Sequence, residues 1–504
     1  MMKYGNLVIR ADANTKIGVG HVMRSMALAQ AWQDYGGRAV LALSMDTPIL
    51  EDRFRSEGMD VVNLTAQPGS NDDAIETAIL AQNTEAAWVA VDGYHFDSEY
   101  QRLIKESGLN LLLIDDIGHA KHYWADIVLN QNIHANEGLY ASREPYTSLL
   151  LGTSYVLLRR EFLHFREWTR EIPDVARKVL VTLGGGDSDN VTLKVIQALN
   201  QIDSSELEVK IVVGPSNPHM DSLRAAVHRS PFNVHVLSSV RNMPGLMAWA
   251  DMAVSAGGST CWELAFMGLP NLILIFADNQ ILLAEGLHTE GVALNLGWSQ
   301  GISDSEVGQA IEELMTTLEV RQKMARCGRE LVDGEGAGRV LKLMRNKTLR
   351  FRRACEEDCL LLWEWINEAD ARSASFTSET IPLEKHVQWL KRKLNDPRCI
   401  FYIVYNGKGM PVGQVRYDLD GKEAVISISI ERRFRGQGYG NLAISLSSWK
   451  LFHGSDVGMI RAYIKQNNKG SVGAFLKAGF RDAGTKIIEG YRAIELVLTR
   501  YGMV

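Results

Sequence analysis

A turn of small residues, Ala256-Gly257-Gly258-Ser259-Thr260, has the composition of a phosphate-binding loop. The apolar run Met252–Val254 before it is expected to form a short buried strand, and Trp262–Met267 after it is expected to open a helix. Small residues let the backbone approach a ligand closely, and the free N–H groups at a helix start favour phosphate. The pattern therefore predicts that a nucleotide diphosphate binds at Gly257, Gly258, Ser259 and Thr260.

Two polar residues near this turn extend the predicted site. Glu263 falls in the first turn of the expected helix, where one carboxylate can accept hydrogen bonds from both hydroxyls of a ribose. Asn279 follows the next apolar run, Asn271–Phe276, which is expected to be a buried strand. We therefore expect a nucleotide-sugar site. The alternative is a tight strand–helix connection that binds no ligand.

A histidine near the N-terminus is the candidate general base. The expected strand Leu7–Ala11 leads into a glycine-containing loop that ends at Gly20 and His21, where a helix is expected to begin. A helix N-terminus disfavours the imidazolium ion, and a neutral imidazole can take a proton from water. Asp12 and Arg24 flank the histidine, and Arg24 lies on nearly the same helix face, from which it could contact phosphate. The alternative for His21 is a packing or capping role.

Polar residues follow three further strands expected in this region. Asp92-Gly93-Tyr94 ends the strand Trp88–Asp92, Asp115-Asp116 ends Leu111–Asp115, and Asn130-Gln131-Asn132 ends Ile127–Asn130. In doubly wound sheets, ligands bind at the carboxyl ends of parallel strands. We therefore assign Asp92 and Tyr94 to the catalytic site, with an ordinary turn as the alternative.

Alternating strands and helices predict an α/β fold with two Rossmann-like domains, residues 1–158 and 159–345. A triple glycine, Gly184–Gly186, follows the expected strand Lys178–Leu183, and Gly185 is assigned to the cleft between the domains. The second domain would hold the nucleotide, and the reacting sugar carbon would face the first.

Residues 348–504 show a different pattern. The expected strand Ala424–Ile430 runs into a loop with the spacing R-x-x-G-x-G, which is followed by the expected helix Asn441–Leu451. Consecutive backbone N–H groups in such a loop can bind a pyrophosphate. A second element, Asn468-Lys469-Gly470-Ser471 followed by FLKAGF, supports the assignment. The cofactor-binding candidates are Ile430, Arg435, Gly436, Gly438, Tyr439, Gly440, Asn468 and Ser471.

Several motifs in residues 1–344 resemble the UDP-sugar hydrolase family of pseudaminic acid biosynthesis: GVGHVMR, VDGY, LLIDD, VLNQN, LGTSYVLLRREF, VTLGGGD and SAGGSTCWELAFMGLPN. The resemblance implies the GT-B architecture and metal-free hydrolysis of UDP-2,4-diacetamido-2,4,6-trideoxy-β-L-altropyranose. The family's catalytic histidine falls on His21, and its uridine and diphosphate contacts fall on residues 257–263.

The C-terminal region resembles the GNAT N-acetyltransferases, and LLLWEWINEADAR, HVQW and VGQVRYD resemble the N-acetyltransferase of the same pathway. The resemblance implies that acetyl-CoA is the co-substrate and that the acceptor is the C4 amine of UDP-4-amino-4,6-dideoxy-N-acetyl-β-L-altrosamine. Phe475 stands where many members carry a tyrosine that protonates the leaving thiolate. Glu431 and His386 are candidates for the general base.

Composition excludes some classes of function. The chain has 504 residues, a net charge of -6 and five cysteines without metal-binding spacing, so we expect no nucleic-acid partner and no metal. No apolar run approaches the roughly 20 residues that span a bilayer, and the N-terminus lacks an apolar signal region, so we expect a cytoplasmic protein without membrane insertion.

The alternative functions are those of a GT-B glycosyltransferase, a protein N-acetyltransferase, a nucleotide-sugar sensor and an enzyme acting on a legionaminic-type isomer.

Overall fold

The computed structural model describes residues 5–12, 20–44, 48–184, 187, 189–203, 205–214, 217–238, 240–407 and 409–500. The chain forms two compact units, one of residues 1–101 with 111–341 and one of residues 102–110 with 342–504. The domain boundaries inferred from sequence, at residues 158 and 345, stay predictions.

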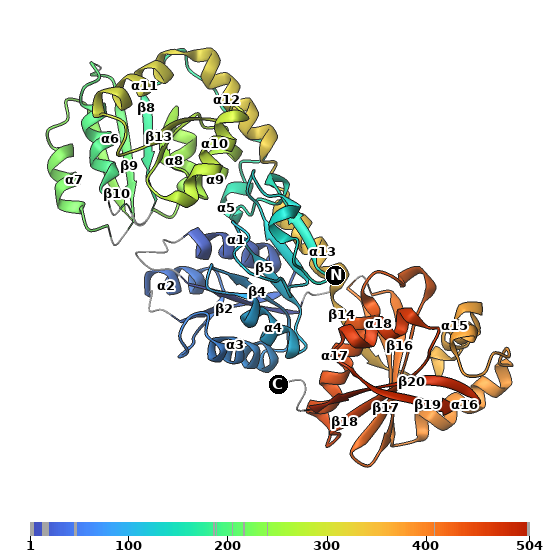
Figure 1. Cartoon of the computed structure of the whole chain (residues 1–504). Helices are drawn as coiled ribbons and strands as arrows, with labels where there is room; N and C mark the ends of the chain where they lie inside the picture. The colour runs from blue at the N-terminus through green and yellow to red at the C-terminus, as the bar shows by residue number, and fades with distance from the viewer. Residues whose placement is uncertain are drawn as a thin grey trace. The chain divides into compact units, whose positions relative to one another are not determined.

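The first sheet of the larger unit is parallel and has the order β3-β2-β1-β4-β5-β6-β7. Its chain order reverses between β1 and β4, and this reversal is where doubly wound sheets bind ligands. Helices α1 and α2 lie on one face and α3 and α4 on the other (Figure 1). The elements are β1 (Asn6–Ala11), α1 (Gly20–Asp34), β2 (Arg38–Leu43), α2 (Pro48–Ser56), β3 (Asp60–Asn63), α3 (Asn71–Asn83), β4 (Ala86–Asp92), α4 (Ser98–Glu106), β5 (Leu111–Ile114), β6 (Ile127–Asn130) and β7 (Ser148–Leu151).

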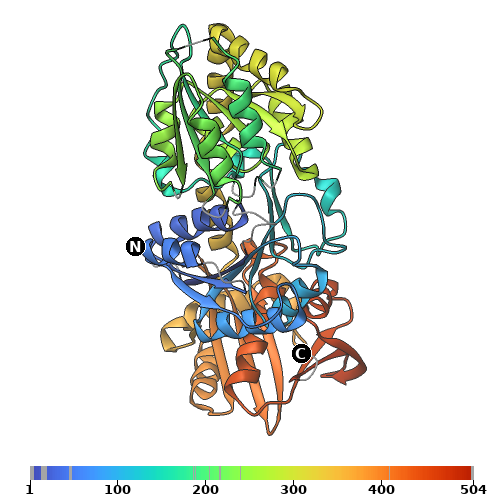
Figure 2. The same cartoon turned by 90° about the vertical axis from the view of Figure 1, so that its left-hand side faces the viewer.

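The second sheet of this unit is also parallel, with the order β10-β9-β8-β11-β12-β13. Its central strands are buried because apolar clusters cover both faces. Figure 2 shows this sheet between its helices. The elements are β8 (Lys178–Thr182), α6 (Val191–Leu199), β9 (Glu208–Val213), α7 (Met220–Val227), β10 (Asn233–Ser238), α8 (Met243–Trp249), β11 (Met252–Ala256), α9 (Thr260–Phe266), β12 (Asn271–Ile275), α10 (Ile281–Thr289), β13 (Ala293–Trp298), α11 (Asp304–Thr316), α12 (Leu318–Leu331) and α13 (Gly336–Lys347).

The smaller unit is built on a mixed sheet with the order β14-β15-β16-β17-β18-β20-β19. Among the described residues of this sheet, the one parallel pair is β17 with β18. It is matched only from Glu423–Val425 to Met459–Arg461, and β17 then continues to Ile430. The two strands therefore separate toward their carboxyl ends. The elements are β14 (Leu349–Arg353), α14 (Cys359–Asn367), α15 (Ala369–Ala374), α16 (Leu383–Asn395), β15 (Cys399–Asn406), β16 (Pro411–Asp420), β17 (Glu423–Ile430), α17 (Tyr439–Gly454), β18 (Met459–Lys465), α18 (Lys469–Lys477), β19 (Arg481–Ile488) and β20 (Tyr491–Thr499).

Candidate active sites

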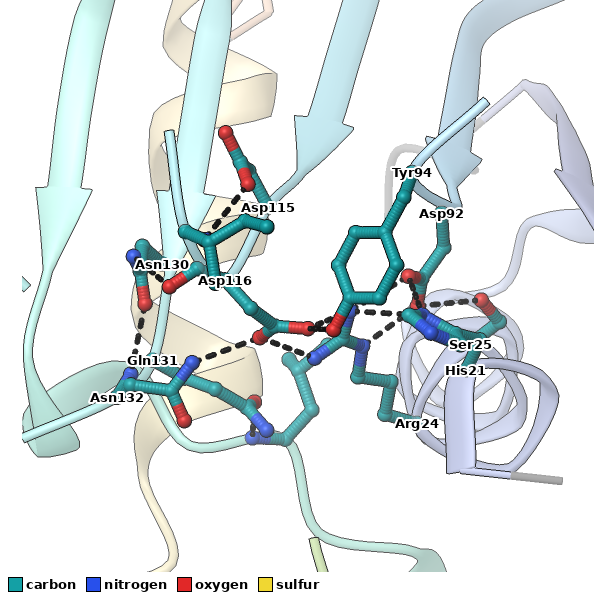
Figure 3. Close-up of polar contacts among 12 residues, drawn as sticks. His21, Arg24, Ser25, Asp92, Tyr94, Asp115, Asp116, Asn130, Gln131 and Asn132 are labelled. Carbon is teal, nitrogen blue, oxygen red and sulfur yellow. Dashed lines mark hydrogen bonds and ion pairs between the residues drawn. The ribbon is translucent and has the colours of Figure 1, made fainter. Parts of the chain in front are cut away.

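The predicted histidine lies in a buried cluster of charged side chains at the carboxyl edge of the first sheet. His21 Nδ1 lies 2.6 Å from Asp92 Oδ1, and Arg24 Nε and Nη2 each lie 2.6 Å from an oxygen of the same carboxylate. Asp92 is 1% exposed, and His21 and Arg24 are each 8% exposed. Figure 3 shows Arg24 between Asp92 and Asp116. The first turn of α1 and the end of β4 therefore bring together three of the predicted site residues.

The hydrogen bonds of the cluster fix the position of the proton on His21. Arg24 Nη2 lies near His21 Nδ1, at 3.0 Å, but its two protons are taken by Asp92 Oδ1 and by Asp116 Oδ2. The Asp92 carboxylate can only accept, so the Nδ1 nitrogen that faces it must carry a proton. A proton on Nδ1 leaves the Nε2 lone pair of a neutral ring free to accept one. The cluster thus holds His21 in the tautomer that a general base requires.

Asp116, which the sequence analysis did not assign to the site, is the second anion of the cluster. It accepts hydrogen bonds from Arg24 Nη1 at 2.7 Å, from Asn132 Nδ2 at 2.7 Å and from the Tyr94 hydroxyl at 3.0 Å. The Tyr94 ring meets the His21 ring edge to face, with centroids 5.0 Å apart. The available signal was the position of the Asp115-Asp116 pair directly after β5, since Asp92 ends the neighbouring strand β4.

Charge pairing determines the protonation of these groups. Burial alone would raise the pKa of both Asp92 and Asp116, but Arg24 outweighs burial and holds both values below the ordinary range of a carboxyl group. Burial, reinforced by Asp116, raises the pKa of the Tyr94 hydroxyl, which is therefore protonated at neutral pH. Four of the five N–H donors of Arg24 point at the two carboxylates: one on Nε, one on Nη1 and two on Nη2.

The predicted nucleotide turn joins β11 to α9. The helix begins at Thr260, two residues earlier than predicted, and Ser259 is its N-cap residue. A Cβ atom at Gly257 would lie 3.0 Å from the Gln280 carbonyl oxygen, so this position has no room for a side chain, whereas a Cβ at Gly258 would meet no described atom within 4 Å. The turn therefore exposes backbone at Gly258, as a phosphate site requires.

The turn lies close to the histidine cluster. A Cβ atom at Gly20 would lie 3.3 Å from Ser259 Oγ, which places the start of α1 against the start of α9. Asn279, in a short 3-10 turn after β12, lies near enough to the Tyr94 hydroxyl to work against the rise in its pKa. A ligand on the glycine turn would therefore reach the region of His21.

Glu263 lies in the first turn of α9, as predicted, and it already has a cationic partner. Arg159 donates to Glu263 Oε1 from Nε at 3.1 Å and from Nη2 at 2.8 Å. Burial raises the pKa of Glu263, and Arg159 works against that rise. Both hydrogen bonds are accepted by Oε1. The ribose hydroxyls would therefore donate to Oε2, and this role of Glu263 stays a prediction.

Two other predicted residues lie elsewhere. The Asp12 side chain is fully buried and pairs with Arg10 at 2.7 Å, while Ser44 N–H donates to it at 2.9 Å. None of the contacts described for Asp12 involves the His21 cluster, so its assignment to substrate also stays a prediction. Gly185 lies outside the described residues.

In the smaller unit, the predicted pyrophosphate loop begins where β17 separates from β18. Gly436 and Gly438 have φ values of +73° and +84°, a conformation that favours glycine. Gly438 is the N-cap residue of α17, so the first N–H groups of that helix, from Tyr439 and Gly440 onward, point back at the loop. The loop has the geometry of an anion site at a helix N-terminus.

The remaining cofactor candidates have partners within the chain. Arg435 donates to the Ile430 carbonyl at 2.8 Å, to Glu368 at 2.6 Å and to Asp370 at 3.1 Å. The Asn468 side chain caps α18 by accepting from Ser471 N–H at 3.1 Å. These contacts position the loop and the start of α18. Direct contact with the cofactor stays a prediction for Ile430, Arg435, Asn468 and Ser471.

Phe475, the departure from the expected tyrosine, is a core residue. It is 3% exposed and packs edge to face on Phe480, with ring centroids 5.0 Å apart.

Within the described residues, no group of three or more His, Cys, Asp and Glu side chains is arranged to hold a metal ion. The described helices also include none with the length and apolar character to cross a bilayer.

Comparison with known proteins identifies the class of each region. Residues 348–481 match the family model of the acetyltransferase (GNAT) domain, and residues 178–335 match that of the glycosyltransferase family 28 C-terminal domain. With two consecutive parallel sheets before the mixed sheet, the chain is of the α/β class: two Rossmann-like domains of the GT-B type followed by a GNAT domain. The predicted fold class is confirmed.

Particular relatives refine this assignment. The chain is 23% identical to the UDP-2,4-diacetamido-2,4,6-trideoxy-β-L-altropyranose hydrolase of Campylobacter jejuni, over 56% of this chain and 97% of the relative. It is 26% identical to the spore coat polysaccharide biosynthesis protein SpsG of Bacillus subtilis, over 49% of this chain and 72% of the relative. An uncharacterised protein of Methanocaldococcus jannaschii is 22% identical over 94% of this chain and 96% of the relative. The chain therefore joins a hydrolase-like region to a GNAT domain.

Proposed function

We propose that the chain is a bifunctional enzyme that acts twice on one nucleotide sugar. The GNAT domain transfers acetyl from acetyl-CoA to the C4 amine of UDP-4-amino-4,6-dideoxy-N-acetyl-β-L-altrosamine. The hydrolase-like region then cleaves UDP-2,4-diacetamido-2,4,6-trideoxy-β-L-altropyranose to UDP and the free sugar. The observation that carries the proposal is the His21–Asp92–Arg24–Asp116 cluster beside the glycine turn, in a chain that also carries a GNAT domain.

In the hydrolytic step, His21 Nε2 takes a proton from one water molecule. The water oxygen attacks the anomeric carbon, and the bond from that carbon to the diphosphate oxygen breaks. UDP leaves with the bonding pair, and the N–H groups of the turn at residues 257–260 balance its charge. A single displacement inverts the anomeric configuration. Asp92 holds the His21 ring and stabilises the imidazolium ion that forms.

In the acetyl-transfer step, a deprotonated amine attacks the thioester carbonyl carbon. The carbon–sulfur bond breaks, an amide forms and CoA leaves as a thiol after protonation of the sulfur. The loop at residues 436–440 holds the cofactor's pyrophosphate, and backbone N–H groups near Ile430, at the free edge of β17, polarise the carbonyl. The split between β17 and β18 supports this placement because it leaves backbone groups of β17 without a neighbouring strand on that side.

Isotope labelling tests the hydrolytic step. The diacetamido nucleotide sugar is incubated with the full chain in water enriched in oxygen-18, with no acceptor present. Attack at the anomeric carbon places the label in the free sugar and leaves UDP unlabelled. Label in UDP would show attack at phosphorus and would contradict the role given to His21. NMR of the free sugar also separates the altrose from the legionaminic-type configuration.

A glycosyltransferase is the second candidate, and the family 28 match of residues 178–335 favours it. Such an enzyme would use the same nucleotide grip but would deliver the sugar to an acceptor. The incubation without acceptor discriminates between the two, because a hydrolase releases UDP at its full rate whereas a transferase needs the acceptor.

A further inference from the structure

Three buried hydrogen-bonding atoms of the GNAT domain have no partner among the described residues: His386 Nε2, Gln414 Oε1 and Glu431 Oε2. The residues that carry them are 3%, 8% and 8% exposed. Leaving such atoms unpaired in the interior costs free energy, and native proteins seldom do so without a reason. The three atoms therefore indicate a site that something else completes.

Two of these atoms lie on one face of the sheet. Gln414 on β16 is paired with Ser429 on β17, and Glu431 N–H donates to the Val412 carbonyl at the end of the same ladder. Since alternate residues of a strand share a face, Ser429 and Glu431 lie on the side of the sheet that Gln414 occupies. The other side carries the core of the domain, to which Val415 and Ile426 belong.

The third atom comes from α16, which runs along this face. Lys393 on the helix contacts Asp418 at 2.6 Å, and the Trp389 ring lies 5.2 Å from the Arg416 guanidinium carbon. Residues 393 and 389 of the helix therefore lie beside residues 418 and 416 of β16, so the helix and the strand run in the same direction. One further turn of the helix reaches His386, whose ring lies 5.3 Å from that of Trp389, and one further step on this face of β16 reaches Gln414. The register places His386 over Gln414.

This location adjoins the place proposed for the thioester. The pairing of β17 with β18 ends at Val425 and Arg461, so Ser429 and Glu431 lie on the part of β17 that has separated from β18. Cations described on this face have partners within the chain: Lys393 and Arg416 contact Asp418, Arg433 contacts Glu431 Oε1 at 2.8 Å, and Lys465 of β18 donates to the Ser373 carbonyl at 3.0 Å. What the face offers a ligand is therefore the unpaired oxygens of Gln414 and Glu431, which accept hydrogen bonds, and His386 Nε2, which accepts one when the ring carries its proton on Nδ1.

We propose that His386, Gln414 and Glu431 bind the primary amine of the acetyl acceptor. A primary ammonium group has three N–H donors, and the site presents three acceptor atoms. This inference rests on the proposed acetyltransferase function and deepens it, since it names the residues that select a primary amine over a hydroxyl.

The same arrangement can prepare the amine for transfer. Burial lowers the pKa of His386, which keeps the ring neutral at pH 7 and able to take one proton from the ammonium group. The freed lone pair then attacks the acetyl carbon and the carbon–sulfur bond breaks. A second amine proton goes to the leaving sulfur to give the CoA thiol, and the remaining N–H becomes that of the amide.

The test uses Gln414→Met in the full chain, which keeps the side-chain length and removes the acceptor. Steady-state acetyl transfer is measured with the UDP-4-amino sugar varied at saturating acetyl-CoA. It is then measured with acetyl-CoA varied at saturating UDP-4-amino sugar. We expect the KM for the amine to rise at least tenfold, while the KM for acetyl-CoA stays within twofold. The thermal midpoint should stay equal or rise, because an apolar group replaces a buried oxygen that has no partner. Gln388→Met, on the exposed side of α16, is the matched control and should change neither constant.

Glu431→Gln, which keeps the shape of the side chain and removes its charge, should also lower kcat/KM for the amine at least tenfold. An unchanged amine KM in Gln414→Met, with acetyl transfer intact, would overturn the inference and leave the acetyltransferase assignment in place. A lowered thermal midpoint with both KM values unchanged would show that Gln414 binds an internal water and would also overturn it. A wild-type chain that acetylates no amino sugar would overturn the proposed function together with this inference.

Discussion

The substitution Asp92→Asn is the sharpest test of the His21 cluster, because the amide has the shape of the carboxylate but not its charge. Oδ1 of Asp92 accepts from His21 Nδ1 and from Arg24 Nη2, and Oδ2 accepts from Arg24 Nε, each at 2.6 Å. An asparagine must place its NH2 group at one of these two positions. There it faces a donor, whichever way the amide is turned.

The expected magnitude follows from the hydrogen bonds that the amide is unable to form. With the NH2 group at the Oδ1 position, the hydrogen bonds from His21 and Arg24 Nη2 both fail, and His21 must move its proton to Nε2, where it can no longer act as a base. With the NH2 group at the Oδ2 position, the hydrogen bond from Arg24 Nε fails, and the other two donors meet a neutral oxygen. At about 2 kcal/mol for each charge-assisted hydrogen bond that is lost, and about 1 kcal/mol for each that meets a neutral oxygen instead, either orientation costs about 4 kcal/mol or more. A loss of this size at the step that forms the imidazolium ion corresponds to roughly a thousandfold in kcat.

The assay is UDP release from the diacetamido nucleotide, followed by chromatography. Acetyl transfer by the same polypeptide is the internal control, since the GNAT domain reports that the chain is intact. Circular dichroism and the thermal midpoint of unfolding check that the larger unit of the variant is folded. Hydrolysis within tenfold of the wild-type rate, in a folded variant, would refute the assignment of the His21 proton.

Three further predictions concern other parts of the account. His21→Ala should abolish UDP release and leave the Kd for UDP within threefold, as measured by calorimetry; retained hydrolysis would remove His21 from the mechanism. Phe475→Tyr should lower the unfolding free energy by about 1–3 kcal/mol without raising the acetyl-transfer rate, because it buries a hydroxyl in an apolar site; a faster enzyme would show that the position still lies at the thiolate. Since the pKa values of Asp92 and Asp116 lie below those of unfolded carboxyl groups, the stabilisation from their charges is present above about pH 4 and is lost as the pH falls further. Urea unfolding of Asp116→Asn should therefore show a shallower loss of stability on acidification than the wild type, and an identical pH dependence would contradict the pairing with Arg24.

Much of the fold could be predicted because its central strands are short apolar runs bounded by glycine or polar residues. The expected ranges of β11 and β12 agree with their observed ends to within two residues for this reason. Strands at sheet edges gave no such signal. β19 is exposed along almost its whole length and β13 is only partly buried, so neither has the apolar pattern of an interior strand.

The site was predictable only in part, for a related reason. His21 and Asp92 were found because each follows an apolar strand, and parallel strands bring their carboxyl ends together. The sequence could not indicate which of Asp115 and Asp116 faces the cluster. Asp115 contacts His119 and Tyr123, whereas Asp116 contacts Arg24. This difference depends on packing between segments far apart in the chain.

The proposed function requires that one polypeptide acetylates and then hydrolyses the same nucleotide sugar. The most direct measurement supplies the purified chain with the UDP-4-amino sugar, with and without acetyl-CoA, and follows all products by mass spectrometry and NMR. With acetyl-CoA we expect a mass gain of one acetyl group, followed by release of UDP and the free diacetamido sugar. UDP release at the same rate without acetyl-CoA, or no acetylated product with it, would contradict the account.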